Sequence, residues 1–145
     1  MLKVMLCVTL IFGASCGGST PPPTVDDGTE SESCLRTKIW EANTDGWSIR
    51  NSGTVTLEVG GHKSFAVNLY KDREYRFLAC GGGQARQVHL QLYDESGTRV
   101  KSAANAGRQP EFGYAPPEAK PHFIVVQNAA NSPGTGKISW TALYK

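Results

Sequence analysis

The stretch VHLQLYDESGTRV, residues 88–100, decides the fold that the sequence predicts. Apolar and polar side chains alternate along its first six residues, which is the period of a β-strand with one face buried and one face in water. The side chains expected to face the core are Val88, Leu90 and Leu92, and those expected to face outward are His89 and Gln91. Asp94 can accept hydrogen bonds from turn backbone and Gly97 can adopt a positive φ, so a tight turn is expected to end the strand.

Five further stretches have the length and the pattern of strands. They are Thr54–Val59, Ser64–Tyr70, Tyr75–Ala79, His122–Gln127 and Lys137–Tyr144. Turn-forming residues separate them, and no stretch keeps a 3.6-residue period for three turns. One helical turn is expected at Ser102–Ala106, whereas Ile39–Trp40 and Trp47–Ile49 are expected to add a strand or to cover one end. The pattern predicts an all-β fold, an antiparallel β-sandwich.

Residues 1–15 are expected to be an export signal that is removed by cleavage. Lys3 supplies the positive charge at the start, Val4–Phe12 is an apolar run too short to cross a bilayer as a permanent helix, and Gly13–Ser15 is a zone of small residues. Cys16 follows at once, and the stretch GASCGG (13–18) resembles a bacterial lipoprotein lipobox. The resemblance implies cleavage before Cys16 and acylation of its thiol, for example with palmitate.

An acylated Cys16 would anchor the chain in a lipid bilayer of the bacterial cell envelope. Gly17 rather than Asp follows the cysteine, which by resemblance to enterobacterial sorting favours the outer membrane where the cell has one. Gly13 stands where the lipobox usually has Leu, so ordinary signal peptidase cleavage followed by secretion is the alternative.

The segment GGSTPPPTVDDGTESES, residues 17–33, predicts a disordered tether because it holds only one sizeable apolar residue, Val25. The chain is therefore divided into a signal peptide (1–15), the lipidated Cys16 with its tether (16–33), and a β-sandwich domain (34–145). A net charge of +2 gives no reason to expect a nucleic-acid partner. No second long apolar run follows the signal, which excludes a protein that spans a membrane several times.

The four cysteines predict one disulfide. Cys7 leaves with the signal and Cys16 is assigned to the lipid, so Cys34 and Cys80 remain as one pair in an exported chain. The bond would attach the start of the domain to the end of a strand. Two buried free thiols are the alternative.

Catalytic signatures are missing from the sequence. It contains no GxSxG, no HExxH, no Walker loop and no cysteine or histidine spacing for zinc, so we expect no enzyme, no cofactor and no metal. His89 and Gln91 are expected on an outward strand face beside Tyr93, where they could line a binding face. Tyr114, in an expected long loop at Phe112–Pro117, is a further candidate because aromatic side chains stack on sugar rings or anchor protein interfaces.

Segments spread over residues 55–144 resemble the bacterial pre-peptidase C-terminal domain. They are GHKSFAVNL (61–69), EYRF (74–77), LQLYDESGTRV (90–100), FIVVQ (123–127) and a last strand after Gly134. Two positions depart from the family pattern, since Glu74 stands where Gly is usual and His122 stands near the usual Tyr. The resemblance implies a jelly-roll-like β-sandwich and a non-catalytic accessory role, often in binding polysaccharide or protein or in aiding export.

The leading hypothesis is a membrane-anchored extracytoplasmic binding module for an envelope glycan or a protein. Its candidate ligand-binding residues are Tyr93, Tyr114, His89 and Gln91. A structural or assembly lipoprotein of an envelope complex is the first alternative, and a small secreted hydrolase is the second.

Overall fold

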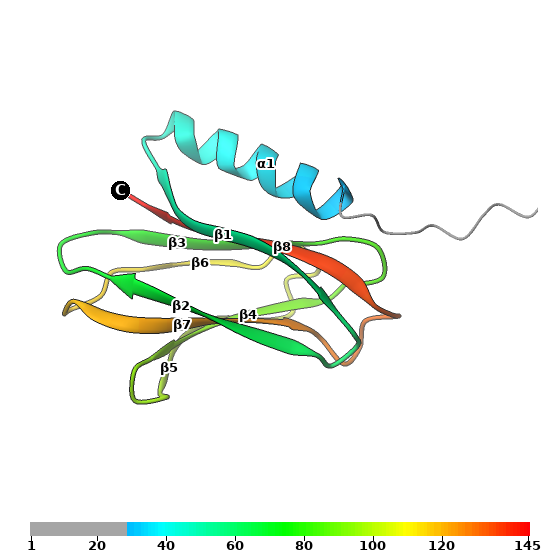
Figure 1. Cartoon of the computed structure of the whole chain (residues 1–145). Coiled ribbons are helices and arrows are strands. Elements are labelled where there is room, and N and C mark those ends of the chain that lie inside the picture. The colour runs from blue at the N-terminus through cyan, green and yellow to red at the C-terminus, as the bar shows by residue number, and fades with distance from the viewer. Residues whose placement is uncertain (1–28) are drawn as a thin grey trace, which may run out of the picture.

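The computed structural model describes residues 29–145 as one helix followed by eight strands (Figure 1). The elements are α1 (Thr29–Thr44), β1 (Ser48–Leu57), β2 (His62–Leu69), β3 (Tyr75–Gly81), β4 (Val88–Asp94), β5 (Arg99–Ala103), β6 (Glu111–Tyr114), β7 (Lys120–Asn128) and β8 (Gly136–Tyr144). The described residues do not include the expected signal peptide, Cys16 with its expected lipid, or the tether as far as residue 28.

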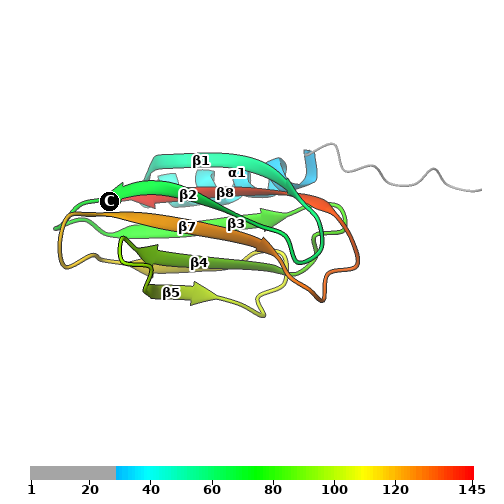
Figure 2. The ribbon, with the colours of Figure 1, turned by 60° about the horizontal axis from the view of Figure 1, so that its bottom comes forward.

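The strands form two four-stranded antiparallel sheets that face each other. Their orders are β1-β8-β3-β6 and β2-β7-β4-β5. Each strand is followed by a strand of the other sheet, except that β4 pairs directly with β5. This is the order of an eight-stranded jelly roll. Figure 2 turns the second sheet toward the viewer, with α1 behind β1 and β8. The predicted all-β sandwich is therefore confirmed.

Alternate side chains from both sheets meet in one core, as the period-two pattern predicts. Val88, Leu90 and Leu92 of β4 are fully buried. Phe65 of β2 packs against Trp140 of the other sheet with ring centroids 4.6 Å apart. Each fully buried aliphatic or aromatic side chain of this kind contributes about 1.5–3 kcal/mol to folding, so the interior provides the main driving force.

Two glycines let the loops at one end close tightly over this core. A Cβ built on Gly81 would lie 2.1 Å from the Ala85 carbonyl oxygen, and one on Gly136 would lie 2.2 Å from that of Gly82. No side chain fits at such distances. The glycine run at 81–83 is therefore a packing feature of the β3–β4 connection.

Helix α1 covers the outer face of the β1-β8-β3-β6 sheet (Figure 1). The apolar residues of this second buried cluster are Leu35, Ala42, Leu78, Cys80 and Leu143, with Cys34, Ile39 and Trp47 packed at its margin. Near the start of the helix, Ser139 of β8 donates a hydrogen bond to Ser31, and Glu30 pairs with Arg108. Both contacts come from residues that the tether prediction left without structure.

The expectation that no helix of three turns would form is wrong, and so is the expectation of disorder for residues 29–33. The buried stripe of α1 runs through Ser31, Leu35, Ile39 and Ala42, spaced three to four residues apart. Two of these four residues are small or polar. The buried positions therefore differ little in hydrophobicity from the exposed ones, and the helical period is hard to recognise in the sequence. Docking on the sheet supplies the stability that the sequence pattern does not display.

Two short strands were also missed. Residues 102 and 103 belong to β5, so the expected helical turn at Ser102–Ala106 is wrong. Residues 111–114 form β6, so the expected loop at Phe112–Pro117 is wrong over its first half. Both strands lie at sheet edges and have five residues or fewer. Within residues 29–145, no helix is long and apolar enough to cross a membrane.

The expected disulfide joins Cys34 of α1 to Cys80 of β3, with the two Cα atoms 6.1 Å apart. We predict that the double variant Cys34→Ala/Cys80→Ala loses about 4 kcal/mol of unfolding free energy, because the bond closes a 46-residue loop in the unfolded chain. Urea denaturation with and without reductant measures this loss. An unchanged midpoint, or two reactive thiols in the unfolded, unreduced wild type, contradicts the prediction.

Candidate functional site

The outer face of the β2-β7-β4-β5 sheet carries the strongest candidate site, and we call this face the platform. Directly paired residues of neighbouring strands point to the same side of a sheet, so the register defines its rows. These rows are His62, Gln127 and His89; then Ser64, Val125, Gln91 and Ser102; then Ala66, Phe123, Tyr93 and Arg99. α1 covers the other sheet, so among residues 29–145 the platform is the broad sheet face that no helix covers.

A depression of about 600 Å³ lies on the platform. Its lining residues are His62, Ser64, Gln91, Tyr93, Phe123, Val125 and Gln127. They combine aromatic rings with amide, hydroxyl and imidazole groups, and no carboxylate is among them. Such a surface offers flat apolar patches together with hydrogen-bond donors and acceptors.

Hydrogen bonds hold three of these side chains in place. The Tyr93 hydroxyl donates to Oε1 of Gln91 over 2.9 Å, and Nε2 of Gln127 donates to the Gly60 carbonyl over 3.5 Å. The Gln91 amide nitrogen is left to donate to a ligand. Phe123 is 39% exposed although it belongs to an apolar strand, so an apolar ring is presented to solvent beside a fixed tyrosine.

The structure brings three of the four predicted site residues together. Tyr93, Gln91 and His89 of β4 lie on the platform in consecutive rows. Tyr114 does not lie there, because β6 belongs to the other sheet and its ring packs against His122 at 5.7 Å between centroids. The β2 and β7 residues of the platform were missed. Only the pairing of strands distant in the sequence reveals them, although the apolar residues Phe123 and Val125, which lie outside the buried core, carry a weak signal.

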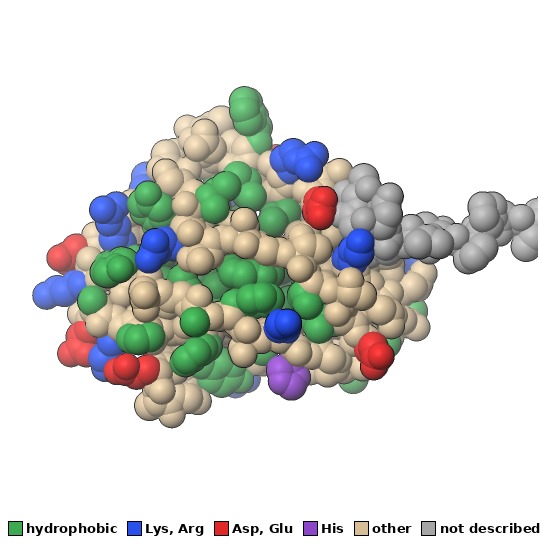
Figure 3. Space-filling model, viewed as in Figure 1, with side chains coloured by type: hydrophobic (Ala, Val, Ile, Leu, Met, Phe, Trp, Pro, Cys, Tyr) green, Lys and Arg blue, Asp and Glu red, His purple; other side chains and the backbone are tan. Residues whose placement is uncertain are grey.

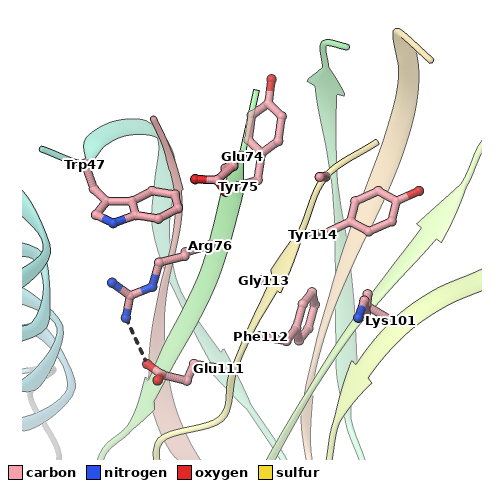
Figure 4. A pocket seen from close by; sticks show the side chains of 10 residues that line it. Trp47, Glu74, Tyr75, Arg76, Lys101, Glu111, Phe112, Gly113 and Tyr114 are labelled. Atoms are coloured by element: carbon pink, nitrogen blue, oxygen red, sulfur yellow. Dashed lines mark ion pairs between the residues drawn. The ribbon is translucent and has the colours of Figure 1, made fainter. Parts of the chain in front are cut away.

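Tyr114 lines a second cavity, of about 690 Å³, that wraps around the edge strand β6 (Figure 4). On the helix side, the Arg76 guanidinium lies over the Trp47 ring at 5.4 Å and 3.6 Å from the Glu111 carboxylate. Figure 4 shows Phe112, Tyr114 and Lys101 on the opposite side of β6. The Glu111 carboxylate also pairs with Lys38 of α1 at 3.8 Å. These contacts fasten α1 to β6, so this cavity has a structural explanation.

The imidazoles of His62 and His122 have different surroundings. His62 and Ser64 both line the depression, but no hydrogen bond joins them. His122 is buried, and its Nδ1 is hydrogen-bonded with the Lys120 carbonyl at 3.0 Å. Among residues 29–145, no three His, Cys, Asp or Glu side chains gather closely enough to hold a metal ion.

The turn that follows Tyr93 is fixed by Asp94, as the sequence predicts. Its Oδ1 accepts from the Ser96 hydroxyl at 2.7 Å, the Ser96 N–H at 2.9 Å and the Thr98 N–H at 3.0 Å. Gly97 has a φ of +88°, the conformation expected of it. The Ser96 hydroxyl and the Thr98 N–H lower the pKa of Asp94 below its ordinary value of 3.8, and the charge of a protonated His122 adds to this shift.

Comparison with solved structures identifies the fold. The pre-peptidase C-terminal domain of a collagenase from Bacillus anthracis is 12% identical, with a TM-score of 0.52 over 65% of this chain and 89% of that chain. The chain has the fold of a pre-peptidase C-terminal domain. The resemblance stated from the sequence is thus confirmed for the architecture.

Two other solved structures match this chain with TM-scores below 0.5. The periplasmic inhibitor of g-type lysozyme from Aeromonas hydrophila, PliG, is 10% identical, with a TM-score of 0.48 over 66% of this chain and 85% of that chain. The Yersinia pseudotuberculosis-derived mitogen is 14% identical, with a TM-score of 0.49 over 63% and 82%. No protein-family model and no curated protein matches the sequence.

We predict that Asp94→Asn destabilises the protein in a pH-dependent way. The folded-state pKa of Asp94 lies below 3.8, so its stabilising contribution is fully present above that value and is lost as the pH falls through the folded-state pKa. Urea midpoints should therefore differ between wild type and variant near neutral pH and converge in acid. A difference that stays constant with pH contradicts this assignment.

Proposed function

We propose that this chain is a lipid-anchored, extracytoplasmic and non-catalytic binding module whose platform binds a glycan of the bacterial envelope. The observation that carries the proposal is the juxtaposition of Tyr93, Phe123 and Gln91 on an open sheet face. Phe123 is exposed and Tyr93 is half-buried on this outward face, so neither ring builds the core. Aromatic surface that remains open to solvent in this way is typical of binding sites.

The chemistry of the platform favours a sugar over a purely apolar partner. Aromatic faces pack against the C–H surfaces of a pyranose ring, while amide and hydroxyl groups exchange hydrogen bonds with its hydroxyls. Gln91, Ser64 and Ser102 supply such polar groups one residue row away from Phe123 and Tyr93, and Gln127 lies one row farther along the platform. Obligate protein interfaces are more apolar at their centre than this mixture of side chains.

Location is supported by two independent features. The Cys34–Cys80 disulfide suits a chain that folds in an oxidising compartment outside the cytoplasm. The lipobox-like stretch around Cys16 supports a lipid anchor at the start of the mature chain. Two or more acyl chains give stable attachment to a bilayer without a spanning helix.

We expect Tyr93→Ala and Phe123→Ala each to weaken binding to purified peptidoglycan about twofold to tenfold, since each removes one stacking surface. Sedimentation with insoluble peptidoglycan measures the bound fraction. Trp40→Ala is the matched control, because Trp40 is a 71% exposed aromatic residue on α1, which covers the opposite sheet. Thermal unfolding of each variant verifies that the fold is retained.

The same experiment separates the competing functions. Binding that survives both platform substitutions, or that is lost equally in Trp40→Ala, removes the platform as the glycan site. If the wild type does not bind peptidoglycan or other envelope polysaccharide and instead co-purifies with an envelope complex, the chain is a structural or assembly lipoprotein. Either result contradicts the glycan proposal.

We expect Cys16→Ser to abolish incorporation of labelled palmitate and to move the protein from the membrane fraction to the soluble fraction. The physical reason is that the thiol is the acylation site and about 0.8 kcal/mol of membrane affinity is lost per buried CH₂ group. Cys34→Ser/Cys80→Ser serves as a control for loss of cysteine elsewhere. Unchanged membrane attachment of Cys16→Ser contradicts the anchor and favours another mode of attachment.

A further inference from the structure

We propose that a pocket at the end of the sandwich that carries the C-terminus binds the carboxylate of an acidic sugar residue, a uronate. The pocket measures about 250 Å³ and lies where β1 begins, β2 turns into β3 and β8 ends (Figure 1). Its lining residues are Ile49, Arg50, Tyr70, Arg73, Tyr75 and Tyr144. They include two guanidinium groups and three phenols, and no acid.

Both arginines are positioned by aromatic rings. The guanidinium of Arg50 lies over the Tyr70 ring at 5.5 Å, and that of Arg73 lies over the Tyr144 ring at 5.3 Å. Stacking uses the flat face of a guanidinium and leaves the N–H donors at its rim available. Those donors match the two oxygens of a carboxylate in a bidentate arrangement.

The positive charges of this pocket are not neutralised by the fold. Within residues 29–145, neither Arg50 nor Arg73 forms an ion pair, whereas Arg76, Arg108, Lys38 and Lys120 each have a carboxylate partner. Asp72 and Glu74 flank Arg73 and line the adjoining depression, but neither carboxylate reaches Arg73. Figure 3 shows Lys and Arg side chains gathered at this end of the molecule, with acidic side chains among them.

The turn that carries Arg73 is fixed by backbone geometry. Glu74 and Lys145 exchange N–H···O hydrogen bonds in both directions, at 3.3 and 3.0 Å, which ties the turn to the last strand. Asp72 adopts a positive φ of 68° within the same turn. Arg73 is therefore held beside Tyr144 of β8, and the pocket exists before a ligand enters.

A buried phenol supplies a third donor. Tyr75 is 2% exposed, and its hydroxyl oxygen accepts the N–H of Tyr70 over 2.8 Å. Its own proton has no acceptor among residues 29–145, so it can be donated to an anion between the two arginines. An unpartnered donor at the base of a pocket with two unpaired cations is suited to a carboxylate.

The choice of a sugar as the occupant follows from the position of the pocket relative to the platform. Ser64 and Asn68 lie on the outward face of β2, and Tyr70 of the pocket directly follows the last residue of that strand, about 20 Å from Ser64 at 3.3 Å per residue. A polysaccharide lying along β2 would reach both sites. This step rests on the proposed function, whereas the carboxylate chemistry of the pocket does not.

Titration calorimetry with oligogalacturonate, its methyl ester and a neutral β-linked glucan oligosaccharide tests the proposal. We expect the wild type to bind the acid on the order of tenfold more tightly than the ester, because only the acid engages the arginines. Arg50→Gln/Arg73→Gln should lose this preference and bind the neutral oligosaccharide as before. Arg36→Gln/Arg86→Gln is the control with equal loss of charge on exposed residues outside the pocket.

The proposed carboxylate pocket is overturned if the wild type binds the acid and the ester with equal affinity. It is also overturned if the control variant loses the preference for the acid as fully as Arg50→Gln/Arg73→Gln does. Equal binding of an acidic peptide of matched charge overturns the assignment to a sugar. If the neutral oligosaccharide binds to none of the proteins but the wild type still prefers the acid to the ester, the result contradicts the platform and not the pocket. The two proposals therefore fail separately.

Discussion

The docking of α1 on one sheet is the constraint on which the rest of the structure depends. A two-layer sandwich has two outer faces, and each can be solvated, covered or used for binding. Here Leu35 and Ala42 of the helix bury Leu78 and Leu143, and the Cys34–Cys80 bond fixes the helix to β3. Because one outer face is closed by the protein's own chain, the other is the broad face left for a partner.

Strand alternation then determines what that open face can do. The side chains that build the core and those that form the platform come from the same strands, one residue apart. Leu92 is fully buried while its neighbours Gln91 and Tyr93 point outward and are joined by a hydrogen bond. A rigid interior therefore holds the outward rows at fixed spacing. A preorganised surface of this kind loses little conformational entropy when it binds.

The sequence predicted those features that depend on local pattern. The β4 alternation, the Asp94 turn and the cysteine pair each follow from a few residues whose chemistry allows few alternatives. Helix α1 was missed because its buried stripe includes Ser31 and Ala42, which resemble surface residues in composition. Strand β6 was missed because four residues, with Gly113 among them, show too little alternation to be recognised.

The candidate site was predicted only in the part that one strand provides. Gln91 and Tyr93 are neighbours on β4, whereas Phe123 joins them through a register that no local pattern encodes. Tyr114 was grouped with them because an aromatic residue in an expected loop has no assigned face. Its pairing with Tyr75 of β3 places it in the other sheet. Long-range pairing, and not residue chemistry, separates the residues that share the platform from the one that lies in the other sheet.

The most direct test of the central claim is to map amide chemical shifts by nuclear magnetic resonance while soluble peptidoglycan fragments are added to the folded, disulfide-bonded protein. Our account predicts that the largest changes fall on β2, β7 and β4 around Ser64, Val125 and Gln91, with α1 unaffected. Changes centred on α1 or on the β6 edge near Glu111 would contradict it, because the ligand would then bind on the side of the β1-β8-β3-β6 sheet, whose outer face α1 covers.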